Sequence, residues 1–92
     1  MSEERDRLER DAARGEQVAA FRAFPGVQEA FQGLEMSYYL AWKESRDPAQ
    51  REVLHAKASV LDELKETLAA VVASGERATV ELQDLERATD QI

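Results

Sequence analysis

The sequence predicts an all-α protein, built as an antiparallel helical hairpin that extends to a three- or four-helix bundle and forms oligomers. Ala and aliphatic residues dominate the apolar set, and only two Pro and four Gly interrupt it, a composition that favours helix over strand. Apolar residues recur every three or four positions, which is typical of buried helical stripes. The 92 residues make one domain with a small core, so association with other copies would add to its stability.

The first segment, residues 1–24, is predicted to be a charged helical arm. Ser2 can cap its start. Acidic and basic residues occupy almost every early position, so we expect that part of the arm to be solvated. Order is expected mainly where Val18, Phe21 and Phe24 find apolar partners.

The second segment, residues 25–75, is predicted to be the core helical hairpin. Pro25-Gly26 interrupts the helical pattern, and a helix follows over about residues 27–45. A longer helix covers about residues 48–74. Each large apolar side chain buried between them contributes roughly 1.5–3 kcal/mol before entropy costs. The predicted core consists of Phe31, Leu34, Tyr38, Trp42, Leu54, Leu61, Leu64 and Leu68.

A tight turn is predicted between these two helices. Asp47 is suited to be an N-cap, and Pro48 then falls at the first helical position, where its missing N–H costs nothing. Gln50 falls at the third position, where it can complete a capping box. Gly75 is predicted to lie just past the end of the longer helix and to terminate it.

The last segment, residues 76–92, is predicted to be an acidic C-terminal helix. It either folds back on the hairpin or extends to pair with another subunit, and the sequence leaves both arrangements open.

The helix at residues 27–45 carries apolar side chains on a second side. Met36 and Leu40 lie roughly opposite the predicted core stripe, with Tyr39 beside them. A helix that is apolar on two sides is either sandwiched inside its domain or used for binding. Valines also widen the stripe of the longer helix. The predicted interface consists of Met36, Tyr39, Leu40, Val53 and Val60.

The charge of the chain limits its partners. There are 19 acidic and 12 basic residues, giving a net charge of −7. A nucleic-acid backbone needs clustered Lys and Arg, so we expect no direct nucleic-acid binding. The absence of cysteine excludes disulfides and thiolate metal sites. No signal peptide or membrane-spanning run is visible, so a soluble cytoplasmic protein without membrane contact is expected.

Glu52 and His55 have the Glu-x-x-His spacing of di-iron sites in four-helix bundles. At about 100° per residue, both point roughly 140–160° away from the centre of their helix's apolar stripe, toward solvent. A lone histidine without a nucleophile partner also gives no basis for acid–base catalysis. We therefore expect no metal, no cofactor, no catalytic residue and no enzymatic activity.

One stretch of the chain, residues 24–82, carries a distinctive set of residues. They are Pro25, Glu29-Ala30-Phe31, Leu34-Glu35, Tyr38, Trp42, Asp47, Arg51-Glu52, Leu54, the helix at 61–68, and Gly75 before Leu82. In this set the chain resembles a group of small helical proteins, without a settled activity, encoded in tailed-phage genomes near head and packaging genes. The resemblance implies a context of virion assembly or DNA packaging, and it carries over no functional residue.

These features predict a non-enzymatic, homo-oligomeric interaction or assembly factor. Its partners would be copies of itself and other phage or host proteins, and it would act in the host cytoplasm or on the virion. The alternative is an acidic inhibitor that mimics DNA and blocks a host DNA-binding or defence protein. In that alternative, Glu81, Asp84 and Glu86 would present the negative charges.

Overall fold

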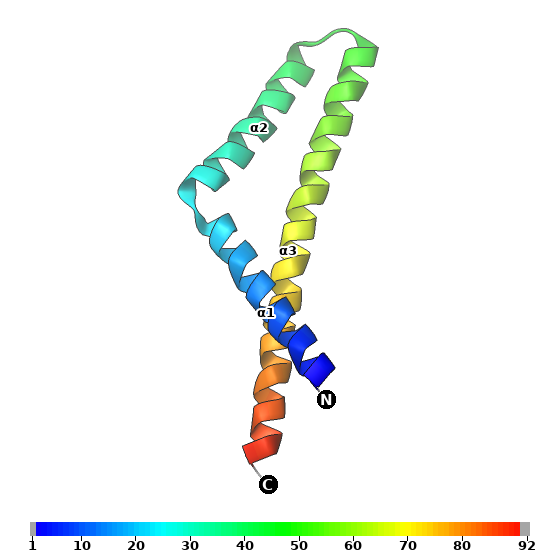
Figure 1. The fold of residues 1–92 in the computed structure, drawn as a ribbon. Coiled ribbons are helices and arrows are strands. Elements are labelled where there is room, and N and C mark those ends of the chain that lie inside the picture. Colours follow the sequence, from blue (N-terminus) through cyan, green and yellow to red (C-terminus); the bar gives the residue numbers. More distant parts are fainter. Residues whose placement is uncertain (1, 91–92) are drawn as a thin grey trace. The chain divides into compact units, whose positions relative to one another are not determined.

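A computed structural model describes residues 2–90, and over these residues the prediction of an all-α chain is confirmed (Figure 1). Three helices follow one another: α1 (Ser2–Ala23), α2 (Pro25–Glu44) and α3 (Pro48–Asp90). Residues 91–92 of the predicted C-terminal segment lie outside the described residues. None of the described helices combines the length and the apolar character that a bilayer crossing requires.

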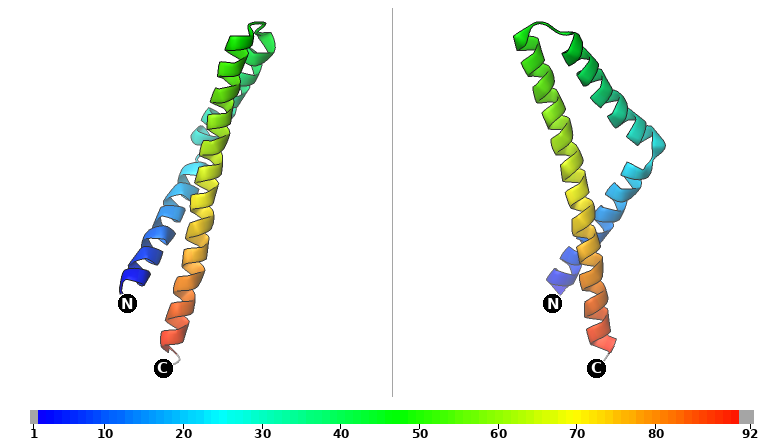
Figure 2. Two further views of the ribbon diagram at one scale, coloured as in Figure 1. Left: turned by 90° about the vertical axis from the view of Figure 1, so that its right-hand side faces the viewer. Right: turned by 180° about the vertical axis from the view of Figure 1, so that it is seen from behind.

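The contacts between residues divide the chain into two units. The crossing unit combines α1 as far as Phe21 with α3 from Leu68 onward. The hairpin unit is residues 22–67, in which α2 and the first half of α3 run in opposite directions from a short turn (Figure 2). The predicted hairpin is therefore present, whereas a bundle of three or four helices and an oligomer stay predictions.

Phe24 separates α1 from α2. A proline disfavours helical backbone in the residue before it, and Phe24 accordingly has an extended conformation with φ −65° and ψ 126°. Pro25 then begins α2, where its missing N–H is no loss. The interruption thus lies one residue before the predicted Pro25-Gly26 break. The side-chain amide of Gln28 donates to the carbonyl of Arg22 at 3.1 Å and so satisfies an acceptor at the end of α1.

Hydrogen bonds from side chains close the turn between α2 and α3. Asp47 is the N-cap of α3, as predicted, because its Oδ1 accepts from the backbone N–H of Ala49 at 3.1 Å. The prediction that Gln50 completes the capping box is wrong. The Gln50 Oε1 instead accepts from the hydroxyl of Ser45 at 2.9 Å, and that hydroxyl accepts from the Asp47 N–H at 3.3 Å. Ser45, which joins the end of α2 to the first turn of α3 through these hydrogen bonds, is buried.

The prediction that Gly75 ends a helix is wrong, because α3 continues through it to Asp90. A terminating glycine usually has a positive φ, and none of the glycines in the described chain does. Gly75 instead lies where α1 crosses α3. A Cβ built on Gly75 would lie 2.7 Å from the Cα of Gly15, and a Cβ on Gly15 would lie equally close to the Cα of Gly75. Glycine is needed at both positions because the two backbones approach so closely.

A repeat of seven residues runs through the sequence of α3. Its members are Leu54, Leu61, Leu68, Gly75 and Leu82. Such a repeat keeps one stripe of side chains available for packing along a helix. In the hairpin unit Leu61 is 6% exposed, and in the crossing unit Leu8 and Ala78 are each 3% exposed. Leu61 therefore belongs to the repeat, Ala78 lies about one turn of α3 after Gly75, and Leu8 is the buried apolar side chain of α1.

Candidate interaction surfaces

The predicted core residues are covered unequally. Leu61 is buried, whereas Leu34, Trp42 and Leu64 remain 41%, 41% and 46% exposed. The half-buried members are Phe31, Tyr38 and Leu54 in the hairpin unit and Leu68 in the crossing unit. Two helices cover only the facing side of each other, so side chains at the margins of the contact stay open to water.

Arg51 and Trp42 contact each other beside the turn that joins α2 to α3. The guanidinium carbon of Arg51 lies 3.8 Å from the centre of the Trp42 ring, within the range of an attractive cation–π contact. The same guanidinium donates to the carbonyl of Ser45 at 3.1 Å. Arg51 therefore joins the start of α3 to the end of α2 through both a ring and a backbone group.

One flank of the hairpin unit is a groove of about 200 Å³ whose lining is mostly apolar, with a few polar side chains among the lining residues. Aromatic rings line it from α2, and Ala58 leaves room for it on α3 because its side chain is small. We call this surface the polar groove after its two carboxylates and its imidazole, and its lining consists of Glu35, Tyr38, Tyr39, Trp42, Leu54, His55, Ala58 and Asp62.

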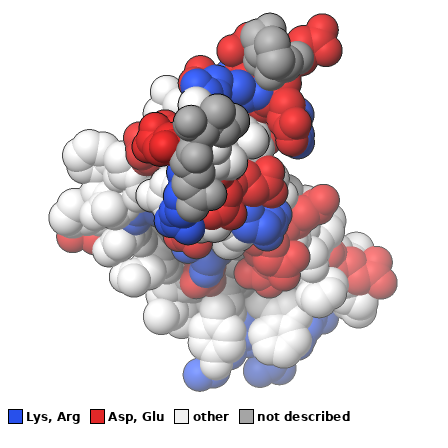
Figure 3. Space-filling model, turned by 90° about the horizontal axis from the view of Figure 1, so that it is seen from below, with Lys and Arg blue, Asp and Glu red and all other residues white. Residues whose placement is uncertain are grey.

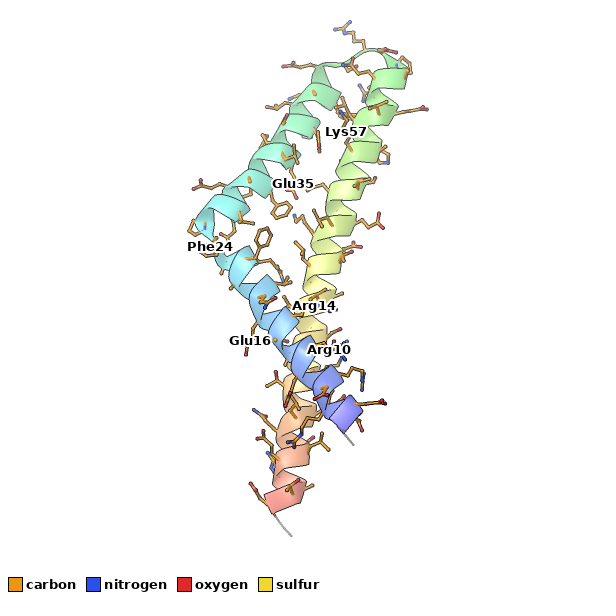
Figure 4. All side chains as sticks on the ribbon, viewed as in Figure 1. Arg10, Arg14, Glu16, Phe24, Glu35 and Lys57 are labelled. Atoms are coloured by element: carbon orange, nitrogen blue, oxygen red, sulfur yellow. The ribbon has the colours of Figure 1, made fainter. Side chains whose placement is uncertain are left out.

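An ion pair crosses from α3 to α2 at the polar groove. The ammonium of Lys65 donates a hydrogen bond to the carboxylate Oε1 of Glu35, which Figure 4 labels on α2. This hydrogen bond, together with the negative charge of Glu35, raises the pKa of Lys65 above its ordinary value. The pair is exposed to solvent, so screening keeps its contribution to stability small.

The Glu52 and His55 side chains are both exposed, and His55 lines the polar groove with Glu35 and Asp62. Across residues 2–90, no cluster of three or more His, Asp or Glu side chains is placed to hold a metal ion.

The opposite flank of the hairpin unit is apolar. At about 100° per residue, Leu34 and Ala41 lie on the side of α2 turned away from Tyr39. By the same geometry, the valines and Leu64 of α3 lie on the side turned away from Asp62. Because α2 and α3 are antiparallel, these two sides meet at one flank. We call this flank the apolar edge: Leu34, Ala41, Val53, Val60 and Leu64, with Lys57 among them on α3 (Figure 4).

The predicted interface residues are all exposed, and they fall on three surfaces. Val53 and Val60 belong to the apolar edge and are 54% and 64% exposed. Tyr39 lines the polar groove. Met36 and Leu40 lie on the outer face of α2, turned away from α3. Sequence spacing on α2 alone grouped Tyr39 with Met36 and Leu40, and the packing of α3 separates them.

The crossing unit offers a different kind of surface. Beside the two glycines lies a hollow of about 330 Å³ lined by Ala12, Gly15, Glu16, Ala19, Val72, Gly75, Glu76 and Thr79. Figure 4 labels Glu16 on α1 in this unit. The sequence predicts order in this arm mainly at Val18, Phe21 and Phe24, so the close crossing at Gly15 is not predicted, although Ala12, Gly15 and Ala19 form a row of small residues at helical spacing. That row was the signal for a close helix crossing.

The acidic residues proposed for DNA mimicry lie on the exposed end of α3. Glu81, Asp84 and Glu86 are exposed, and an Arg87 guanidinium nitrogen lies 3.6 Å from Asp84. The positive charge of Arg87 therefore lies among the negative charges of these three acidic residues. The face in Figure 3 likewise shows acidic and basic side chains interspersed with uncharged ones.

Comparison of the chain with models of protein families, with curated proteins and with solved structures finds no match.

Proposed function

We propose that this chain is a non-enzymatic interaction protein that associates with copies of itself and acts as an assembly factor. The observation that carries the proposal is the exposure of large apolar side chains on several sides of the hairpin unit, including Met36 at 56% and Leu40 at 47%. Contiguous apolar patches on a soluble surface generally mark binding sites. Each such side chain that a partner covered would contribute roughly 1.5–3 kcal/mol.

The net charge shapes how copies of the chain meet. Each copy carries −7, so two copies repel one another at long range. Association therefore depends on apolar contact, and salt strengthens it by screening the repulsion.

The proposed setting is virion assembly or DNA packaging in a tailed phage. Its support is the resemblance carried by the aromatic spacing of Tyr38 and Trp42 and by the turn at Asp47. Small terminase subunits and scaffold-like or connector-associated proteins are the nearest roles. Portal and terminase genes beside the coding gene would support this setting, and an unrelated neighbourhood would count against it.

The test of self-association is the native mass of the full chain at micromolar concentration, measured by light scattering or native mass spectrometry. We expect a mass above that of one chain, increasing with added salt. A mass of one chain at every concentration and salt level would show that the proposal is wrong.

A further inference from the structure

We propose that the polar groove of the hairpin unit binds an arginine side chain of a basic partner protein, with the guanidinium between an aromatic ring and a carboxylate. The proposal goes beyond self-association, because it concerns a different surface and a partner of opposite charge. Its basis is that one groove contains both kinds of group that bind organic cations. They are the aromatic rings of Tyr38, Tyr39 and Trp42 and the carboxylates of Glu35 and Asp62.

The size of the groove favours a single side chain over a free small molecule. Sites for small molecules usually have volumes of about 300–1,000 Å³ and cover most of the ligand surface. The polar groove is smaller, at about 200 Å³, and it lies on the flank of a unit of two helices. A side chain attached to a partner protein needs less cover, since the surrounding surface of that partner adds to the contact.

A contact within the chain shows how the lining of the groove receives a guanidinium. Arg51 lies with its guanidinium carbon 3.8 Å from the centre of the Trp42 ring, and it donates to the Ser45 carbonyl at 3.1 Å. One planar cation thus contacts a ring and an oxygen at the same time, for which the guanidinium is better shaped than an ammonium group. Tyr39 and Asp62 offer a ring and an oxygen to a guanidinium from outside.

Asp62 and Tyr39 are the lining groups that the chain leaves open. Lys65 pairs with Glu35 and so occupies the other carboxylate of the groove. Within residues 2–90, Asp62 forms no ion pair and is exposed. Tyr39 is 56% exposed, and the cation–π contact of the described chain is on Trp42 instead. The net charge of −7 attracts a basic partner at long range, and these two groups then complement its arginine.

The first experiment titrates the full chain with a short, terminally blocked, alanine-based peptide that carries one arginine. Trp42 is the only tryptophan and lines the groove, so its fluorescence reports on binding. The control peptide has citrulline in place of arginine, which keeps the shape of the side chain and removes its charge. We expect a saturable change in fluorescence with the arginine peptide and none with the citrulline peptide. Equal responses to both peptides, or no response to either, would overturn the proposal.

The second experiment compares two neighbouring charge deletions in the same titration. Asp62→Asn removes the open carboxylate of the groove, whereas Glu63→Gln removes one negative charge from an exposed residue about 100° further around α3. We expect Asp62→Asn to weaken binding of the arginine peptide about tenfold and Glu63→Gln to leave it near the wild-type value. Equal weakening by both variants would mean that the peptide senses only the net charge, and the groove assignment would be wrong.

A pair of aromatic deletions tests the ring in the same way. Tyr39→Leu removes the open ring of the groove and keeps an apolar side chain, and Phe24→Leu does the same at an exposed residue outside the groove. We expect only Tyr39→Leu to weaken binding, by about two- to fivefold. All the substituted residues are exposed, so helix content by circular dichroism should stay near the wild-type level. Unchanged binding by Tyr39→Leu would show that the ring takes no part.

Salt separates this proposal from self-association. Added salt should weaken binding of the arginine peptide, because it screens the attraction between the guanidinium and the acidic chain, and it should strengthen contact between copies. A chain that is monomeric throughout but binds the arginine peptide at the groove contradicts self-association alone. A chain that associates but does not distinguish arginine from citrulline contradicts the groove assignment alone.

Discussion

In the crossing unit α3 meets its neighbour through glycines, and in the hairpin unit it meets its neighbour through large side chains. Gly15 and Gly75 bring two backbones together so closely that a Cβ on either would overlap the other. In the hairpin unit, Leu61 is buried between the helices, while large side chains such as Leu34 and Trp42 leave apolar margins uncovered. The close crossing has no room for added atoms, whereas the hairpin has unsatisfied apolar surface to offer a partner.

The largest expected effect comes from enlarging the crossing. Gly75→Leu places a side chain where the backbone of α1 lies, and overpacking of this kind destabilises by up to about 3 kcal/mol. We expect hydrogen exchange of α1 to accelerate strongly while exchange in α2 is unchanged. Equal protection of α1 in the variant and the wild type would contradict the close crossing.

Gly33 provides the matched control, because it is also helical but an added Cβ there meets nothing within 4 Å. Gly33→Ala is therefore expected to stabilise α2 by up to about 1 kcal/mol through helix propensity alone. A lower free energy of unfolding for Gly33→Ala would show that Gly33, like Gly75, has no room for an added Cβ.

A cavity in the hairpin unit is expected to have the next largest effect. Leu61 is 6% exposed, so Leu61→Ala removes well-packed atoms and should lower the free energy of unfolding by about 2–3 kcal/mol. Leu40→Ala, at a half-exposed position of the outer face, should change it by less than about 1 kcal/mol. Denaturant unfolding of both variants measures the difference, and equal losses would mean that the hairpin has no distinct inner side.

The turn of the hairpin unit gives a smaller effect. Asp47→Ala removes the acceptor for the Ala49 N–H and should lower the free energy of unfolding by about 1 kcal/mol. Asp47→Asn keeps an acceptor, so its free energy of unfolding should stay close to that of the wild type. The measurement is again denaturant unfolding. If both variants lower the free energy of unfolding equally, the side-chain hydrogen bond of Asp47 does not stabilise the turn.

The smallest effect is expected from the ion pair between α2 and α3. The pKa of Lys65 is raised in the folded chain, so its stabilising contribution is fully present below the ordinary lysine pKa and is lost as the pH rises through the raised value. Because the pair is exposed, the change is expected to be slight and to weaken with salt. Comparing the alkaline stability of wild type with Lys65→Met checks it, since the variant should lack this alkaline loss.

Much of this fold could be predicted because local rules decide it. The apolar spacing and the Asp47-Pro48 pair predict the hairpin and its turn, and the structure has both. Gly75 could not be interpreted locally, because a terminating glycine and a crossing glycine look the same in sequence. The leucine repeat that continues to Leu82, with no proline after Gly75, was the evidence for a continuous helix.

The candidate surfaces were harder to predict because they depend on two helices at once. The apolar residues of α2 and α3 could be identified from each helix alone. Which of them share a flank depends on how the antiparallel helices face each other, and no single helix contains that information. Tyr39 illustrates the difficulty, since it lies near Met36 on the helix surface but lines the groove with His55.

The only tryptophan of the chain, Trp42, lies in the hairpin unit beneath the Arg51 guanidinium. Its fluorescence therefore reports on residues 22–67 and is blind to events confined to the helix crossing, whereas circular dichroism sees every helix. If the two spectroscopic melting curves separate, the protein does not unfold in a single cooperative step, and the optical signals assign each transition to its own part of the chain.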